Sequence, residues 1–239
     1  MKKRYRILIS ISLLLNIFLT TVLLFYINNK GGKKYFFQQY LNHKNGYLGD
    51  IKTTRKEEFD MVETKENSII MLGDSLTHNM IWDEAFKNTN VINRGISGNT
   101  TEDILGGLEE VIMRNPKKIF LMIGINDLAK YISKDKIISN YSVIIDRLIN
   151  KLPNTTIYIQ SILPINTNIK CLSLSNDDIE ETNRLIKDIA ENKNIEYIDL
   201  YKSFIKDGQL NKELTFDGVH LNAKGYTIWI SSIKKYVEQ

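Results

Sequence analysis

Cysteine, histidine and proline are scarce in this 239-residue chain, and each scarcity excludes a class of structure. A single cysteine, Cys171, cannot form an internal disulfide, so the fold does not depend on a disulfide framework. Three scattered histidines, His43, His78 and His220, offer no cluster at metal-site spacing, so we expect no metal and no other cofactor. With three prolines and 43% hydrophobic residues, the chain is suited to one substantial core.

Acidic residues are absent from the first 49 positions, which carry eight Lys and Arg. From residue 50 onward the chain has 24 Lys and Arg and 28 Asp and Glu. This part therefore has a net charge of −4, although the whole chain has a net charge of +4. A nucleic-acid-binding domain needs clustered basic residues on its folded surface. The charge distribution therefore argues against a nucleic-acid partner.

One long apolar run extends from Ile7 to Ile27, directly after a basic amino terminus. A helix of that length spans ~30 Å, the thickness of a hydrocarbon core. A cleaved signal peptide is the alternative, but no Ala-x-Ala site follows the run, since the first alanine is Ala85. We expect a membrane anchor at 1–29, a juxtamembrane linker at 30–66 and a globular domain at 67–239. The basic residues before the span favour a cytoplasmic amino terminus, with the domain outside the cell membrane.

Beyond residue 67, short apolar runs alternate with amphipathic stretches. We expect strands at 68–72, 91–92, 119–123, 156–162 and 195–200. We expect helices near 79–87, 101–114, 135–151, 178–193 and 222–237. Repeated alternation of this kind predicts an α/β fold with a parallel sheet covered on both faces.

The first apolar run leads straight into Gly73-Asp74-Ser75. A turn there places the Ser75 hydroxyl at the carboxyl end of a parallel strand, where open α/β sheets bind ligands. A nucleophilic serine needs an imidazole to take its proton and a carboxylate to orient that imidazole. Asp217 and His220, three residues apart, supply both groups. The tripeptide alone is more often an ordinary turn, so the hypothesis depends on the other motifs.

Two further segments with glycine and asparagine follow apolar runs. The first extends from Asn93 to Thr100, and the second, at 124–127, follows the strand expected at 119–123. Backbone N–H groups and side-chain amides are suitable donors to the oxyanion of a tetrahedral intermediate. We therefore expect the oxyanion donors to be Gly98 and Asn126.

The chain resembles the SGNH (GDSL) hydrolase family through four motifs: Gly-Asp-Ser-Leu, Ser-Gly-Asn-Thr, Gly-Ile-Asn-Asp and Asp-Gly-Val-His. The resemblance implies a three-layer α/β/α sandwich with a five-stranded, flavodoxin-like sheet. It also implies a role for each residue of the site: nucleophile and oxyanion N–H donor for Ser75, further oxyanion donors in Gly98 and Asn126, and a triad completed by Asp217 and His220. The segment from Trp82 to Thr101 is similar to the branch of platelet-activating-factor acetylhydrolase, whose members often cleave acetyl esters.

Four further residues each have two interpretations. Asp74 and Asp127 are candidates for a catalytic carboxylate pair. Acidic residues are abundant, however, so we expect Asp74 to bind backbone N–H groups beneath the nucleophile and Asp127 to brace the loop of the third motif. Trp82 and Phe86 follow the nucleophile, and they either line the acyl pocket or pack in the core.

These inferences predict a membrane-anchored serine esterase that removes short acyl groups, O-acetyl above all, from a cell-envelope or environmental carbohydrate. Three alternatives remain open: a lysophospholipase or lipase acting on membrane lipids, an O-acyltransferase that uses the same site, and a non-catalytic glycan-binding module. The ester substrate and the membrane are the expected partners.

Overall fold

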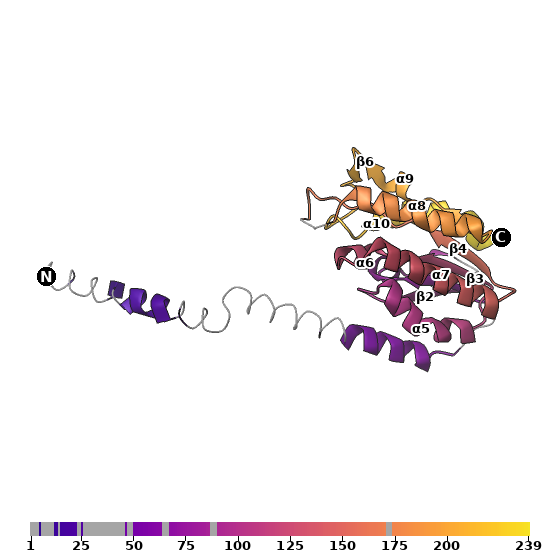
Figure 1. Cartoon of the computed structure of the whole chain (residues 1–239), viewed down its shortest axis with the longest axis horizontal. Coiled ribbons are helices and arrows are strands. Elements are labelled where there is room, and N and C mark those ends of the chain that lie inside the picture. The colour runs from indigo at the N-terminus through magenta and orange to yellow at the C-terminus, as the bar shows by residue number, and fades with distance from the viewer. Residues whose placement is uncertain are drawn as a thin grey trace. The chain divides into compact units, whose positions relative to one another are not determined.

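The computed structural model of the chain describes residues 5, 12–13, 15–22, 25, 46, 50–63, 67–86, 90–170 and 174–239. The chain divides into two units, Met1–Asp50 and Ile51–Gln239, and Figure 1 labels the helices and strands of the second. Much of the predicted span from Ile7 to Ile27, most of the predicted linker, and Cys171 lie outside the described residues. Among the helices that the structure describes, none is both long and apolar enough to cross a bilayer.

The second unit is built on a five-stranded parallel sheet with the strand order β2-β1-β3-β4-β5. The strands are β1 (Ile69–Gly73), β2 (Val91–Gly95), β3 (Lys118–Met122), β4 (Thr156–Gln160) and β5 (Glu196–Ile198). The chain goes from β1 to the edge strand β2 and returns to β3 on the other side of β1, the order of flavodoxin-like folds. The predicted five-stranded parallel sheet is thereby confirmed.

The last two strands end two residues earlier than their apolar runs. The Ser161 hydroxyl accepts the backbone N–H groups of Leu200 and Tyr201 at 2.9 and 2.8 Å. These bonds turn the chain into a short helix directly after β5, so the apolar residues there pack in the core without extending the ladder.

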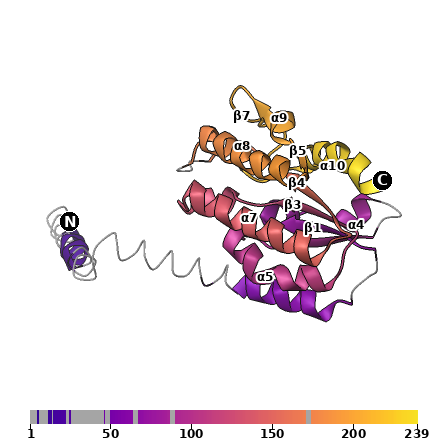
Figure 2. The same cartoon turned by 45° about the vertical axis from the view of Figure 1, so that its right-hand side comes forward.

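Helices lie on both faces of the sheet (Figures 1 and 2). Within the helix expected near 79–87, the described residues form only the short α4 (Trp82–Ala85), and another short helix, α3 (Ser75–His78), precedes it. The longer helices are α5 (Thr101–Met113), α7 (Lys134–Lys151), α8 (Asn176–Asn192) and α10 (Ala223–Glu238). Short elements fill the connections: α6 (Ile125–Ala129), α9 (Tyr201–Phe204), and the hairpin of β6 (Ile205–Lys206) and β7 (Gln209–Leu210).

Alternate residues of β1 point to opposite faces of the sheet. Ile70 and Leu72 belong to the core beneath α5, α7 and α8, which Figure 2 shows side by side over one face. Ile69 and Met71 belong to the core beneath α10. Burial on both faces explains why the strands read as continuous apolar runs in the sequence.

The compact unit begins with helical residues 51–61, ahead of the predicted domain start at residue 67. Phe59 is the one buried side chain of this stretch. Nη2 of Arg114 donates to the Phe59 carbonyl oxygen at 2.6 Å, and the Arg94 guanidinium lies 4.2 Å above the Phe59 ring. Because Phe59 alone is buried among residues 51–61, this stretch has no amphipathic stripe, and the sequence pattern does not reveal the contact.

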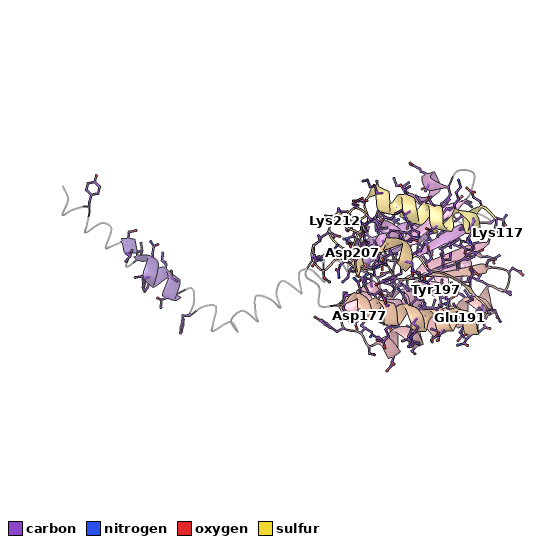
Figure 3. All side chains as sticks on the ribbon, turned by 90° about the horizontal axis from the view of Figure 1, so that it is seen from above. Lys117, Asp177, Glu191, Tyr197, Asp207 and Lys212 are labelled. Carbon is purple, nitrogen blue, oxygen red and sulfur yellow. The ribbon has the colours of Figure 1, made fainter. Side chains whose placement is uncertain are left out.

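Labelled residues in Figure 3 mark the two ends of this unit. Asp177, at the start of α8, lies at the same end as Asp207 and Lys212, whereas Glu191 lies toward the end marked by Lys117. Lys117 directly precedes β3, so its end holds the amino termini of the strands. The opposite end holds the carboxyl termini, where ligands bind in sheets of this kind.

Candidate active site

The strand register brings three of the predicted motifs to one edge of the sheet. Gly73 at the end of β1 lies opposite Gly95 at the end of β2 and Met122 at the end of β3. The three loops that leave this row carry the predicted nucleophile and both further oxyanion donors: Ser75, Gly98 and Asn126.

Ser75 is the first residue of α3, and Asp74 caps that helix. Oδ1 of Asp74 accepts the Leu76 N–H at 2.9 Å, as predicted from the sequence. Burial of the carboxyl raises the pKa of Asp74 to about 7. The turn also lies close against β2: a Cβ on Gly95 would be 2.2 Å from the backbone nitrogen of His78, so only glycine fits there.

Ser75, His220 and Asp217 form a continuous hydrogen-bonded chain. Oγ of Ser75 lies 3.0 Å from Nε2 of His220, and Nδ1 of His220 lies 2.8 Å from Oδ2 of Asp217. Burial acts to raise the pKa of Asp217, but hydrogen bonds from the backbone and ring of His220 and from the Val219 N–H hold it well below its usual range. An ionised carboxylate at Nδ1 leaves Nε2 facing the hydroxyl, an arrangement suited to proton transfer.

The loop that carries His220 is held by hydrogen bonds on both sides. Oγ1 of Thr215 donates to the His220 carbonyl oxygen at 2.6 Å and accepts the Gly218 N–H at 2.9 Å. The Asn166 N–H, in the segment after β4, donates to the Gly218 carbonyl oxygen at 2.8 Å. Gly218 has φ +87°, and a Cβ there would lie 2.7 Å from the Asn166 carbonyl oxygen, so the loop requires glycine at this position.

The predicted oxyanion donors come from neighbouring loops. Nδ2 of Asn126 donates to the Asn99 carbonyl oxygen at 2.9 Å, which ties the third motif to the second. The amide has a second hydrogen for another acceptor. Within the part of the chain that the structure describes, the backbone N–H groups of Ser75 and Gly98 donate to no protein acceptor. These groups can therefore serve an oxyanion.

Residues 71–228 match the GDSL-like lipase/acylhydrolase family. The chain belongs to this family. The match spans all four motifs, from the Gly73-Asp74-Ser75 turn to the His220 loop.

Two kinds of relative illustrate what this chain is similar to. N-acylneuraminate cytidylyltransferase of Streptococcus agalactiae is 28% identical over 192 residues, covering 79% of this chain and 43% of that protein. This chain thus spans less than half the length of that relative. The alpha1 subunit of platelet-activating factor acetylhydrolase IB from Rattus norvegicus is 28% identical over 171 residues, covering 68% of this chain and 72% of that protein.

Two solved structures share the fold of this GDSL hydrolase. One is described as a platelet activating factor from Streptococcus pneumonia. It has a TM-score of 0.74 and 27% identity, and the match covers 86% of this chain and 100% of that chain. The acetyl xylan esterase AlAXEase has a TM-score of 0.61 and 25% identity, covering 71% of this chain and 99% of that chain.

Asp127 braces the loop that carries Asn126, as predicted. Its buried carboxylate accepts both the backbone N–H and the hydroxyl of Thr101, the first residue of α5. The hydroxyl contact is 2.6 Å, and Nδ2 of Asn140 donates to the same hydroxyl at 2.8 Å. Burial raises the pKa of Asp127 although the Thr101 hydrogen bonds act against the shift.

Trp82 and Phe86 belong to the buried core beneath α10. Their side chains are 0% and 2% exposed. Nε1 of Trp82 donates to the Thr77 carbonyl oxygen at 2.8 Å, and its ring meets Trp229 of α10 edge-on at 5.1 Å. Of the two interpretations, packing in the core therefore fits the burial of both side chains.

Two residues at the site were not predicted from the sequence. Nζ of Lys170 lies 3.3 Å from Oδ2 of Asp217, a contact between positions 47 apart. Phe216 stacks on the His220 ring with 66% of its surface exposed. Adjacency to Asp217 was the one available indication for Phe216, whereas Lys170 had none.

A separate cavity of about 290 Å³ lies between residues 51–61 and α5 of the GDSL hydrolase. Phe59, Leu72, Ile96, Ile104 and Val111 form much of its apolar lining. None of the triad residues lines it, so the cavity is not the place where an ester meets the nucleophile.

Proposed function

We propose that this GDSL hydrolase is a membrane-anchored serine esterase that removes short acyl groups, above all acetyl, from a cell-envelope or environmental carbohydrate. The observation that carries the proposal is the chain of contacts from Ser75 through His220 to Asp217, at 3.0 and 2.8 Å. A serine, a histidine and an ionised aspartate in this order activate a hydroxyl for attack on an ester.

In the proposed reaction, Oγ of Ser75 attacks the ester carbonyl carbon while Nε2 of His220 takes the hydroxyl proton. Asp217 stabilises the resulting imidazolium, and the oxyanion accepts hydrogen bonds from the N–H groups of Ser75 and Gly98 and from the Asn126 amide. The bond to the alcohol oxygen then breaks, and His220 gives its proton to that oxygen. Water, deprotonated by the same imidazole, hydrolyses the acyl-enzyme and releases the acid.

The choice of a short acyl group on a carbohydrate is supported by the names of two similar proteins. One solved structure is an acetyl xylan esterase, and relatives from Rattus norvegicus are platelet-activating factor acetylhydrolases. Both names describe an acetyl ester. A carbohydrate bearing O-acetyl groups also suits an enzyme at the outer surface of a cell membrane.

The membrane location is supported by sequence alone. The apolar run from Ile7 to Ile27 follows Lys2, Lys3, Arg4 and Arg6. We propose a single-pass anchor with a cytoplasmic amino terminus and an extracytoplasmic catalytic domain. The test is fractionation of the full chain together with a topology reporter fused at the carboxyl terminus. Reporter activity on the cytoplasmic side would contradict the orientation, and a wholly soluble protein would contradict the anchor.

An acyl-chain-length series on the purified full chain in detergent tests the enzymatic proposal. Acetate, butyrate and octanoate esters of one alcohol are compared, with Ser75→Ala as the inactive control. We expect the highest kcat/KM for acetate, and labelling of wild type by a fluorophosphonate that the variant loses. A preference for octanoate would instead indicate a lipase. Transfer of acetyl to an added polysaccharide would indicate an acyltransferase, and glycan binding without turnover would indicate a binding module.

A further inference from the structure

Phe216 places an exposed aromatic ring beside the imidazole of His220. The two ring centroids are 5.8 Å apart, and the ring planes differ by 15°. His220 is itself partly buried, whereas Phe216 is 66% exposed. A large apolar side chain in water is common when isolated, but here it lies parallel to the side chain at the centre of the triad.

The position of this ring is fixed by the loop. The Phe216 N–H donates to the His220 carbonyl oxygen at 3.3 Å, and Thr215 pairs with Leu221 in an isolated antiparallel bridge. The two stacked residues are therefore opposite each other across a tight loop. These bonds hold the backbone of Phe216, and the ring itself stacks on the His220 imidazole.

The chemistry of ester cleavage decides which half of the substrate reaches this ring. Nε2 of His220 must deliver its proton to the leaving alcohol oxygen, so the alcohol half of the ester lies next to the imidazole. The carbonyl oxygen instead points to the donors on the loops of Ser75, Gly98 and Asn126. A ring stacked on the imidazole is accordingly placed to meet the alcohol half.

We propose that Phe216 determines specificity for the alcohol half of the ester by stacking on a sugar ring, an inference that rests on the proposed carbohydrate substrate. One face of a pyranose presents C–H groups, which suit the negative face of an aromatic ring. Ile169, 48% exposed, lies next to Gly218 in the same loop region and adds a second apolar side chain. The open ring offers a flat platform and not the enclosed groove that a long hydrocarbon chain needs.

The test compares two acetate esters on the full chain: an O-acetylated methyl glycoside and ethyl acetate. Both produce the same acetyl-enzyme, so they differ only in the alcohol half. We expect Phe216→Ala to lower kcat/KM about five- to tenfold for the glycoside and less than about twofold for ethyl acetate. Phe216→Tyr keeps the aromatic face and should retain the glycoside rate, whereas Phe216→Leu, which keeps apolar bulk alone, should not.

The control variant is Val143→Ala, which truncates an exposed apolar side chain of α7 and should change neither rate. Equal losses on both esters with Phe216→Ala would assign the ring to positioning His220 and overturn the inference. Unchanged rates on both esters would overturn it as well. If the wild type cleaved ethyl acetate but not the glycoside, the proposed carbohydrate substrate itself would be wrong, an outcome visible before any variant is made.

Discussion

The hydroxyl of Tyr226 donates a 2.8 Å hydrogen bond to the backbone carbonyl oxygen of Leu76, the residue that follows the nucleophile. The two residues are 150 positions apart, and both are buried. Tyr226 belongs to the first turns of α10, directly after the His220 loop. The bond therefore links the helix that begins with Ser75, the proposed nucleophile, to the helix that follows His220, the proposed base.

Tyr226→Phe should remove this link without changing the volume of the core. We expect a loss of about 1 kcal/mol in the free energy of unfolding, because one buried hydrogen bond is lost and the Leu76 carbonyl loses a partner. Urea unfolding measures the change. A variant as stable as wild type would mean that water replaces the hydroxyl, and the kcat of the same variant reports whether the distance from Ser75 to His220 depends on the bond.

Asn126→Ala should remove one oxyanion donor and leave the triad in place. We expect kcat/KM for an acetate ester to fall by roughly 10²–10³, the effect of deleting a single donor in other oxyanion holes. Fluorophosphonate labelling should persist at a reduced rate, since Ser75 and His220 are unchanged. A loss below about threefold would show that Asn126 serves only to hold the Asn99 carbonyl.

Gly95→Ala should destabilise the nucleophile turn, because its Cβ would lie 2.2 Å from the His78 nitrogen and 2.7 Å from the His78 Cα. We expect a loss of about 1–3 kcal/mol in unfolding free energy together with reduced esterase activity. Gly107→Ala is the matched control, since nothing lies within 4 Å of its added Cβ in α5. That change should stabilise the protein by about 0.5–1 kcal/mol. Similar effects of the two substitutions would contradict the steric argument.

Asp74 should make stability fall as pH rises from about 4 to 7. The unfolded chain loses this proton near its ordinary value of 3.8, whereas the folded chain keeps it up to about pH 7. Rising pH in that window therefore favours the unfolded state, by roughly 4 kcal/mol at most, and the cost is constant above it. The comparison is wild type against Asp74→Asn at pH 5 and pH 8. The variant should lose less stability between the two values, and identical losses would refute the burial argument.

Local sequence pattern was sufficient for the strand that precedes Ser75 and for the parallel sheet. Continuous apolar runs encode burial on both faces of a strand, a feature that depends on neighbours in the chain. The strand lengths were less well predicted. After β5 the chain turns into a helix because the N–H groups of Leu200 and Tyr201 donate to the Ser161 hydroxyl, and such bonds between distant positions leave no trace in a local window.

The family, the residue types of the proposed triad and the apolar run at the amino terminus could be recognised from the sequence, because each depends on local order and composition. Other features are visible only in the tertiary structure. Oγ of Ser75 lies 3.0 Å from Nε2 of His220 although the two residues are 145 positions apart, and Trp82 is buried in the core. Lys170 contacts Asp217, and Phe216 stacks on His220. Those contacts follow from the order of the strands and the packing of the loops. They are properties of the whole fold, in which each side chain's neighbours come mostly from elsewhere in the chain.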